Sequence, residues 1–495
     1  MITKLHTPEQ AASWLHARVK GGLSTDSRKV GAGDGFIAWP GATVDARRHV
    51  GEVIKANAGA CLVDSKGIEA YGFTNEKIAA YPDLKAAAAP IAAAYYGDPS
   101  RHLQTVAITG TNGKTSTAWW LAKALGKLNR KCGVVGTLGI GLPDAMVFNG
   151  LTTPDPVLLQ QQLRRFVDEG FVACAIEASS IGISEKRLDA THVQVAVFTN
   201  FTQDHLDYHG SMQAYWAAKE SLFTWPGLQS AVINVDDAKG RALSVMLKVG
   251  NIDVWTVAIH QPARLSAEGI EQHSGALRFV VVEGAERYVV STSAIGLYNV
   301  SNLLGVVGTL RALGLSLEDA TKACCDLPAV PGRLNTLSQA GKPLVVVDYA
   351  HTPDALEKVL LALQPVAQTR GGKLWCVFGC GGDRDVSKRP LMAAVAQKNA
   401  DQTVVTSDNP RSENPAAIIS QILLGATHSE SVRVQADRAL AIVETFASAQ
   451  ANDVLLLAGK GHENYQEVLG TKHPFDDLLH AQLALDAWRQ IGAAS

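Results

Sequence analysis

A glycine-rich segment between residues 110 and 116 has the composition of a phosphate-binding loop. The apolar run 105–109 before it reads as a buried strand, and 116–128 after it reads as a helix. Such a turn exposes backbone N–H groups, and the helix N-terminus adds a partial positive charge. Lys114 can reach the outer phosphates of a nucleotide, and the Thr115 hydroxyl can ligate Mg²⁺. The predicted nucleotide loop comprises Gly110, Thr111, Asn112, Gly113, Lys114, Thr115 and Ser116.

This loop by itself does not separate a kinase from an ATPase, a GTPase or a ligase. A plain glycine-rich turn that ends in a lysine is a further alternative. The Asn-Lys-x-Asp motif, which reads guanine in many GTPases, is absent from the sequence, and this argues weakly against a GTP-driven switch. The loop therefore predicts a nucleotide site and leaves the reaction open.

Two further residues that follow predicted strands could hold a metal. Glu177 directly follows the buried run 171–176, and His205 follows the run 193–199. In a doubly wound sheet, the carboxyl ends of the strands form the edge where ligands bind. Glu177 and Thr115 are therefore predicted to ligate Mg²⁺, which would offset the repulsion between two anions. His205 could hold a second metal or could be a turn histidine satisfied by the backbone.

Alternating apolar runs and helical patterns predict the sheets that would position these groups. The helix pattern 156–169 precedes the strand 171–176, which is the βαβ rhythm of a parallel sheet covered by helices. Turn-forming residues cluster at 95–100 and at 327–343, where boundaries are expected. The last segment repeats the rhythm, with strands at 344–347, 374–378, 403–406 and 454–457 and helices at 353–363, 389–399 and about 476–490. The predicted fold is α/β with three domains: a central P-loop-type parallel sheet with helices on both faces, a Rossmann-like C-terminal domain and a smaller mixed α/β N-terminal domain.

Length and composition agree with an ordinary globular protein. The chain has 495 residues, enough for about three domains. Its net charge of −2 provides no bulk attraction to nucleic acid or to an acidic membrane, so anionic substrates would need local basic groups. The seven cysteines are scattered and predict neither a disulfide framework nor a zinc site. Residues 1–20 lack an apolar signal segment, and no apolar run reaches about 18 residues. A soluble cytoplasmic protein without nucleic-acid partners or an integral membrane segment is predicted.

Several motifs, taken in order, resemble those of one enzyme family. The spacing within 109–115 is shorter than in common P-loop proteins and resembles the ATP loop of the Mur ligases of peptidoglycan synthesis and of the related folylpolyglutamate synthases. The resemblance covers nearly the whole chain. It implies ATP and Mg²⁺ as cofactors, conversion of a carboxylate to an acyl phosphate, and attack by an amine that releases phosphate. Matching segments follow at 177–180, 199–210, 298–302, 331–333 and 348–354.

Within the family, the chain most resembles the members that add 2,6-diaminopimelate. The segment Asp408-Asn409-Pro410-Arg411 carries this assignment, with 381–385 and 459–463 around it. The resemblance implies ATP-dependent addition of meso-diaminopimelate to UDP-N-acetylmuramoyl-L-alanyl-D-glutamate, a step that serves cell wall biogenesis, cell shape and cell division. The same chemistry with L-lysine, or a polyglutamate-adding ligase, is the alternative. The implied diaminopimelate residues are Arg384, Asp408, Asn409, Pro410, Arg411, Gly459 and Glu463.

Arg411 would decide the choice of amino acid, because diaminopimelate carries one more carboxylate than lysine. A planar guanidinium can meet a carboxylate through two parallel hydrogen bonds, which an ammonium cannot. Arg384 could take the other carboxylate, and Glu463 could hold the distal ammonium. The alternative for Arg411 is a solvated loop arginine or an ion pair with Glu413.

The resemblance also implies roles in catalysis and nucleotide binding. Lys219 lies in 217–220, where the family carries a carbamylated lysine that binds Mg²⁺, whereas a helix lysine is otherwise usually solvated. Asn299 and Asn302 would otherwise be simple helix caps, and His351 could be nucleotide-adjacent or a turn residue. The implied catalytic residues are Lys114, Lys219, Glu177 and His205; the metal ligands are Thr115, Glu177, His205 and carbamylated Lys219; and further nucleotide contacts are Asn299, Asn302, Arg333 and Asp348.

The UDP-sugar site is implied with two departures from the family pattern. The segment Gly41-Ala42-Thr43-Val44-Asp45 lacks the histidine that relatives often have after the glycine, and Glu185 stands where many have glutamine. The implied UDP-sugar residues are Thr25, Ser27, Thr152, Thr153, Ser179, Glu185 and Arg187.

The implied domains are 1–100 for the UDP-sugar, 101–336 for ATP and 337–495 for the amino acid, in a monomer whose partners are its small-molecule substrates. Two other classes compete with this interpretation. A P-loop kinase leaves Lys219 and 408–411 unexplained, and a non-enzymatic nucleotide scaffold leaves the metal-ligand set unexplained.

Overall fold

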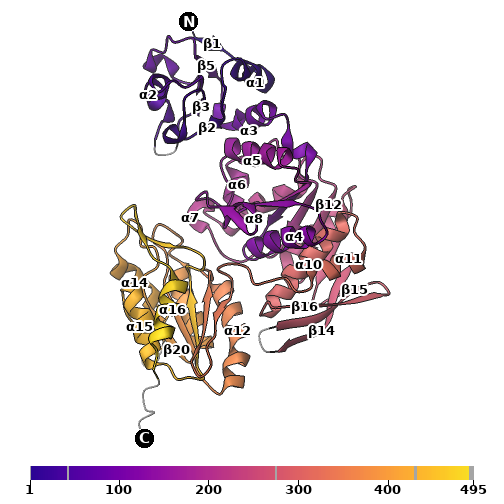
Figure 1. The fold of residues 1–495 in the computed structure, drawn as a ribbon, viewed down its shortest axis with the longest axis vertical. Coiled ribbons are helices and arrows are strands. Elements are labelled where there is room, and N and C mark those ends of the chain that lie inside the picture. The colour runs from indigo at the N-terminus through magenta and orange to yellow at the C-terminus, as the bar shows by residue number, and fades with distance from the viewer. Residues whose placement is uncertain (1, 42–43, 274–275, 428–431, 490–495) are drawn as a thin grey trace.

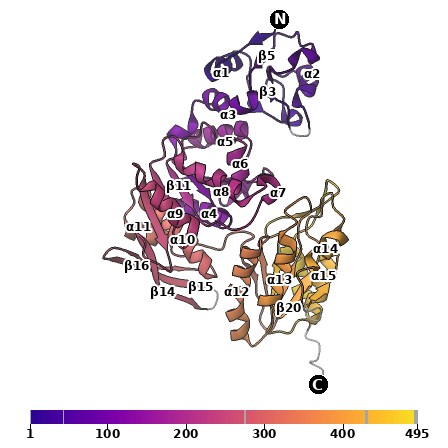
Figure 2. The same cartoon turned by 180° about the vertical axis from the view of Figure 1, so that it is seen from behind.

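The computed structural model describes residues 2–41, 44–273, 276–427 and 432–489. Three successive parts of the chain each form a sheet covered by helices, and they follow one another from the N-terminal to the C-terminal end of the molecule (Figures 1 and 2). We call them the N-terminal, central and C-terminal units. The predicted α/β class is confirmed, with one large sheet in each of three parts and a separate two-stranded sheet, β23-β24. No helix of the described ranges is both long and apolar enough to cross a bilayer.

The N-terminal unit contains five short strands in the order β1-β5-β4-β3-β2, and all their pairings are parallel. Neighbouring residues of β4 face opposite ways, with Leu62 in one apolar cluster and Val63 in another, so both faces of the sheet are covered. The elements are β1 (Thr3–Lys4), α1 (Pro8–His16), β2 (Leu23–Ser24), η1 (Ser27–Lys29), β3 (Gly35–Ala38), η2 (Ala46–His49), α2 (Val50–Lys55), β4 (Ala60–Asp64), η3 (Ile68–Tyr71), β5 (Ile78–Tyr81), α3 (Leu84–Tyr95) and η4 (Pro99–His102).

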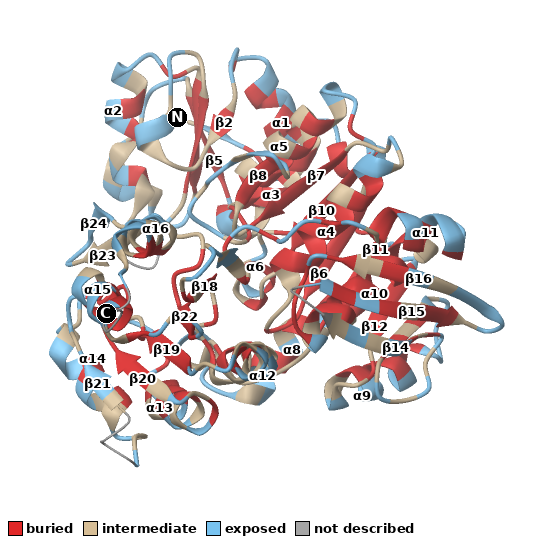
Figure 3. Cartoon of the chain, turned by 60° about the horizontal axis from the view of Figure 1, so that its bottom comes forward, coloured by how far each residue is buried: buried red, intermediate tan, exposed pale blue. Residues whose placement is uncertain are grey.

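The central unit contains an eleven-stranded sheet with β6 near its middle, in the order β16-β15-β14-β13-β12-β11-β6-β10-β7-β8-β9. Strands β14 to β7 of this order pair in parallel, and antiparallel strands extend both edges. β6 is flanked by two apolar clusters, since Val106 and Ile108 face one and Ala107 faces the other. Figure 3 shows these strands buried beneath helices.

The predicted strands and helices of this unit are present, with ends that differ by a few residues. Its elements are β6 (Gln104–Thr109), α4 (Lys114–Lys127), β7 (Cys132–Gly136), β8 (Gly139–Leu142), β9 (Ala145–Val147), α5 (Pro156–Asp168), β10 (Ala173–Glu177), α6 (Ser180–Ser184), β11 (Val195–Phe198), α7 (Leu206–His209), α8 (Met212–Glu220), η5 (Ser221–Thr224), β12 (Ser230–Asn234), α9 (Ala238–Leu247), β13 (Asp253–Ala258), β14 (Leu265–His273), β15 (Ala276–Glu283), β16 (Glu286–Thr292), α10 (Leu297–Ala312) and α11 (Leu317–Cys324).

The C-terminal unit contains a six-stranded sheet in the order β17-β18-β22-β19-β20-β21, parallel except for β17. β17 begins at Asn335 and β6 at Gln104; the predicted domain ends at 100 and 336 stay predictions. The elements are β17 (Asn335–Leu337), β18 (Leu344–Asp348), α12 (Pro353–Arg370), β19 (Leu374–Phe378), α13 (Lys388–Asn399), β20 (Gln402–Val405), α14 (Pro415–Leu423), β21 (Val432–Val434), α15 (Arg438–Ser448), β22 (Val454–Ala458), β23 (Tyr465–Val468), β24 (Thr471–Pro474) and α16 (Asp477–Ala487).

Candidate active site

Two glycines give the phosphate loop its shape. Gly110 directly follows β6 with φ of +145°, and a Cβ added there would lie 1.9 Å from Thr199 Oγ1. Gly113 precedes α4 with φ of +88°, and its added Cβ would lie 2.3 Å from Asn302 Oδ1. Only glycine combines these conformations with such close neighbours. Because α4 has no side-chain cap, the N–H groups of its first turn are free to receive an anion.

Lys114, Thr115 and Glu177 meet at this loop, as their positions after β6 and at the end of β10 predict. Lys114 Nζ donates to the carbonyls of Gly110 and Thr111 at 2.9 and 2.8 Å. Thr115 Oγ1 donates to Glu177 Oε2 at 2.9 Å and accepts from Arg333 Nη2 at 3.0 Å. Burial lowers the pKa of Lys114, and Glu177 and Asp204 act in the opposite direction. The loop thus carries a cation and a hydroxyl, and the hydroxyl contacts a carboxylate of the neighbouring strand β10.

Lys219 is not the solvated helix lysine that its position on α8 would ordinarily suggest. Its side chain is buried, with 1% exposed, and Nζ donates to Gly110 O at 2.8 Å. Burial, and then the neighbouring charge of Lys114, hold the pKa of Lys219 well below its usual value. A neutral amine is the form that adds to carbon dioxide, so this environment favours carbamate formation.

The donors around the loop suit Mg²⁺. Within the described parts of the chain, no group of three or more His, Cys, Asp or Glu side chains is assembled to hold a metal. Mg²⁺ is commonly held by one or two carboxylates together with substrate phosphates and water. Glu177, the Thr115 hydroxyl and a carbamate on Lys219 would supply such a set, which fits the ion because a nucleotide completes it.

Asp204 lies where the central and C-terminal units meet. Its carboxylate is 3.4 Å from His205 Nε2, 3.9 Å from His351 Nε2 and 3.6 Å from Lys388 Nζ. Burial raises the pKa of Asp204, but Lys388 and the two histidines outweigh it, so the pKa is well below its usual value. Burial lowers the pKa of His205 and of His351 to about 4. Both rings are therefore neutral at pH 7, and Lys388 is the cation that faces Asp204.

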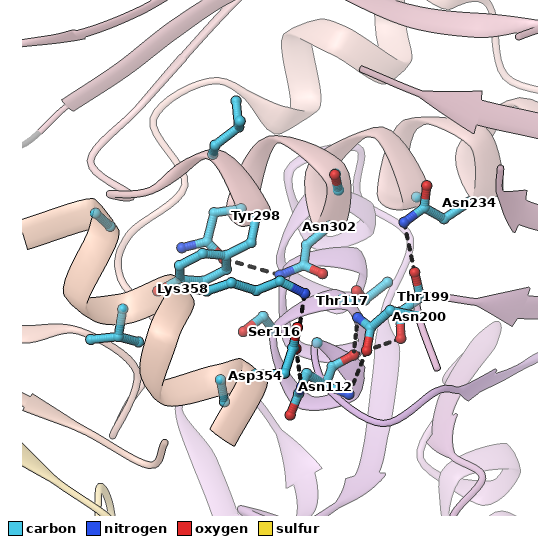
Figure 4. A pocket seen from close by; sticks show the side chains of 18 of the residues that line it. Asn112, Ser116, Thr117, Thr199, Asn200, Asn234, Tyr298, Asn302, Asp354 and Lys358 are labelled. Carbon is cyan, nitrogen blue, oxygen red and sulfur yellow. Dashed lines mark hydrogen bonds and ion pairs between the residues drawn. The ribbon is translucent and has the colours of Figure 1, made fainter. Parts of the chain in front are cut away.

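A cavity of about 640 Å³ opens beside the phosphate loop, between α10 and α12 (Figure 4). Asn302 Nδ2 donates to Asn299 Oδ1 at 3.1 Å, so the two predicted nucleotide residues share one face of α10. Asp348 accepts from the backbone of Leu334 and Ala350 at 2.7 and 2.8 Å. Asn299, Asn302, Arg333, Asp348 and His351 all line this cavity together with residues of the phosphate loop.

Asp354 and Lys358 line the cavity and were not predicted as site residues from the sequence. Asp354 Oδ2 accepts from Asn112 Nδ2 and from Lys358 Nζ, each at 2.9 Å, so the phosphate loop is joined to α12 (Figure 4). The sequence offered one indication of this role, because Asp354 is the last residue of the matched segment 348–354. An Asp and a Lys four residues apart on a helix are usually a surface pair, and this concealed the contact.

Most of the predicted UDP-sugar residues gather beside Glu177. Thr153 Oγ1 donates to Glu177 O at 2.6 Å and lies 2.9 Å from Ser179 Oγ. Arg187 Nη1 donates to Thr153 O at 2.9 Å, and Thr152 Oγ1 is 3.0 Å from Thr137 Oγ1.

The remaining residues of that set lie further out. Thr25 lies near Asp155, the N-cap residue of α5, and Ser27 lies in η1 of the N-terminal unit. Glu185 forms an ion pair with Lys85 of α3 at 2.7 Å. The glutamine that many relatives have at this position carries no charge and could not form this pair. In the segment 41–45, residues 42 and 43 lie outside the described part of the chain.

The predicted amino-acid residues lie on loops that follow β19, β20 and β22. Asn409 Nδ2 donates to Glu463 Oε2 at 2.8 Å, and buried Lys460 reaches both side chains at 3.1 and 3.2 Å. Burial, and then Asp408, raise the pKa of Glu463. Lys460 belongs to a matched segment, but its role in holding Asn409 and Glu463 was not predicted. Asp408, Pro410 and Gly459 border the same loops: a Cβ on Gly459 would meet Asp408, and one on Gly382 would meet Pro410.

The two arginines of this site have different surroundings, and Arg411 is not paired with Glu413. Arg411 has φ of +50°, donates to Gly382 O at 2.6 Å and lies 3.5 Å from Glu467. The alternative pairing with Glu413 is wrong, because fully buried Arg389 takes Glu413 at 2.8 Å. Arg384 is exposed and bonds only a backbone carbonyl among the described residues, that of Asp383 at 3.1 Å.

Comparison with known proteins identifies the family. Residues 108–310 match the Mur ligase middle domain, and residues 332–461 match the Mur ligase glutamate ligase domain. A UDP-N-acetylmuramoyl-L-alanyl-D-glutamate–2,6-diaminopimelate ligase of Acidovorax sp. (strain JS42) is 56% identical over 97% of both chains, and one of Janthinobacterium sp. (strain Marseille) is 48% identical over 97% of both.

Solved structures agree with this match. A structure of a ligase with the same name is 33% identical, with a TM-score of 0.64 over 94% of both chains. The MurF ligase of Thermotoga maritima in complex with ADP shares the fold, with a TM-score of 0.69 at 16% identity over 96% of this chain and 98% of that one. The chain belongs to the Mur ligase family.

Proposed function

We propose that this chain uses ATP to join meso-diaminopimelate to UDP-N-acetylmuramoyl-L-alanyl-D-glutamate. The strongest support is the 56% identity, over 97% of both chains, with a relative named for this reaction. The enzyme is a ligase, and the residues described above would serve as a phosphate loop, a metal-ligand set and two loops that each carry one arginine. The test is release of phosphate, which should require ATP, the UDP-sugar dipeptide and diaminopimelate together.

The proposed first step transfers the γ-phosphoryl group of ATP to the substrate carboxylate, giving an acyl phosphate and ADP. Lys114 and the N–H groups of α4 would hold the outer phosphates, and Arg333 would approach from the junction of the units. Mg²⁺, when bound by Thr115, Glu177, His205 and carbamylated Lys219, supplies charge that offsets the repulsion between the two anions. The cluster of Thr153, Ser179 and Arg187 beside Glu177 would hold the acceptor peptide.

In the proposed second step, the amine of diaminopimelate attacks the acyl carbon, an amide bond forms, and phosphate leaves. The amine must lose a proton in this step, and the released phosphate can accept it. Arg411 and Arg384 would hold the carboxylates, and Glu463 would hold the distal ammonium. L-lysine has one carboxylate and would leave either Arg411 or Arg384 without a substrate carboxylate, so these loops favour diaminopimelate.

Arg411→Ala should lose diaminopimelate use by the equivalent of about 2–5 kcal/mol in kcat/KM, because a charge-assisted pair in a closed site is lost. The measurement is ligation with meso-diaminopimelate and with L-lysine over a range of concentrations. Arg433→Ala is a matched control in the same unit, since Arg433 is exposed and bonds Ser448 at 2.8 Å. If the unmodified chain prefers lysine, or if Arg411→Ala keeps its full preference for diaminopimelate, this specificity is wrong even if the ligase chemistry stands.

We further propose that one copy of the chain is sufficient and that it works in the cytoplasm. Every group assigned above comes from a single chain, so no partner subunit is required. Its ATP and UDP-activated substrates are cytoplasmic metabolites. Sedimentation of the purified chain at working concentrations tests the first point, since an obligate dimer would contradict it.

A further inference from the structure

A second contact between the units involves residues that do not themselves line the nucleotide cavity. Gln203 Nε2 donates to Ser387 Oγ at 2.9 Å and lies 3.3 Å from Asp385 Oδ2. Next to this contact, Lys388 Nζ is 3.6 Å from Asp204 Oδ1. Residues 203–204 belong to the central unit, and 385–388 belong to the C-terminal unit. The two segments therefore dock through two hydrogen bonds and one ion pair.

Burial makes this ion pair sensitive to loss of either partner. The side chains of Lys388 and Asp204 are 6% and 7% exposed. Removing one partner of a buried pair leaves the other charge without water and without a counter-ion. While both charges are present, each is the counter-ion of the other, and the pair favours the docked arrangement of the two units. If one charge is removed, the remaining charge can regain water only if the units separate.

The docked segments carry the two halves of the proposed reaction. On one side, Asp204 precedes His205, and its charge acts on Lys114 and Lys219. On the other side, the loop 381–387 carries Arg384, and Gly382 O accepts from Arg411. The position of this loop relative to the His205 turn therefore sets the distance between the amine and the activated carboxyl group.

We propose that Lys388 is a positioning residue that, through its buried ion pair with Asp204, holds the amino-acid loop 381–387 against the phosphoryl-transfer site. This inference rests on the proposed function and adds a residue to it. Lys388 does not line the nucleotide cavity. It begins α13, and its neighbour Arg389 already fixes that helix within the C-terminal unit through Glu413. The position of α13 within its own unit therefore does not depend on Lys388. The ion pair of Lys388 acts between the two units instead.

The test is Lys388→Met, which keeps an unbranched side chain of similar length and removes the charge. We expect kcat/KM for diaminopimelate to fall by about 10²-fold, as for a misplaced reactant, through both KM and kcat. The Kd for a non-hydrolysable ATP analogue should stay within about threefold, because Lys388 is not among the residues lining the nucleotide cavity. Lys398→Met is the control, since Lys398 lies on the same helix and pairs with Glu357 at 3.1 Å inside the same unit.

A double-mutant cycle with Asp204→Asn measures the pair itself. The combined variant should lose no more than the worse single variant, because both remove one interaction. If Lys388→Met does not fold, Gln203→Met breaks the neighbouring contact from the other side and should raise the KM for diaminopimelate by a smaller factor.

Three results would overturn the inference: additive losses in the cycle, an equal loss of nucleotide affinity, or unchanged kinetics in a folded variant. Failure of the unmodified chain to ligate diaminopimelate would instead refute the proposed function.

Discussion

Lys114→Ala is expected to lower the kcat of ligation by about 10³–10⁵-fold, the contribution that a cation makes at a transferring phosphoryl group. Among the described residues, Lys114 Nζ donates hydrogen bonds only to carbonyl groups of its own loop, so the rest of the described fold does not need these bonds. Alanine also has a higher helix propensity than lysine, so the substitution should not weaken α4. The variant should therefore melt close to the unmodified chain while phosphate release with all three substrates is lost.

Lys123→Ala provides the matched control for this experiment. Lys123 lies on the same helix, but its Nζ pairs with Asp144 at 2.6 Å, outside the residues that line the nucleotide cavity. An exposed pair of this kind is worth at most about 1 kcal/mol in stability. Near-normal ATP-dependent ligation by Lys114→Ala would refute the assignment of the phosphate loop.

Lys219→Ala should reduce kcat by about 10³-fold or more, because a metal ligand that supplies several kcal/mol of charge stabilisation disappears. Added formate or acetate should restore part of the activity by taking the place of the carbamate. Isotope-labelled carbon dioxide should give a carbamate signal by nuclear magnetic resonance in the unmodified chain and none in the variant.

Two further variants separate chemistry from packing at this position. Lys219→Met fills the buried volume without forming a carbamate, so it should be as inactive as the alanine variant and more stable. Lys239→Ala removes a nearby lysine of α9, whose Nζ lies 5.1 Å from the Trp216 ring, and should keep its activity. A fully active Lys219→Met would show that no carbamate is needed.

The strands around the nucleotide site could be predicted because they are buried on both faces and read as continuous apolar runs. β14 to β16 escaped prediction for the opposite reason. In β15, exposed Arg278 alternates with buried Leu277 and Phe279, so only half of its residues are apolar signals. In the N-terminal unit, β1 and β2 have two residues each, too few to show any period.

Site residues could be predicted where one short segment contains the whole motif. They could not be predicted where their role depends on a contact that forms only in the folded chain. The loop 110–116 and the segment 408–411 each contain their own motif. Asp354 and Lys388 matter because of partners on another unit, such as Asn112, which is 242 residues away from Asp354. Nothing local distinguishes such residues from ordinary helix charges, since the contact exists only once both sheets are built.

The crowding around Gly110 and Gly113 has a consequence for antibacterial resistance. A compound that binds the backbone of this loop would face two positions where any replacement adds a Cβ within 2.3 Å of Thr199 or Asn302. A bacterium could not escape such a compound by exchanging either glycine without distorting the loop that holds its own nucleotide. Escape mutations would then have to arise at the borders of the cavity, at residues such as Lys358 or Leu361 of α12. A compound that contacts only the loop would not touch these residues, so few such mutations would weaken its binding.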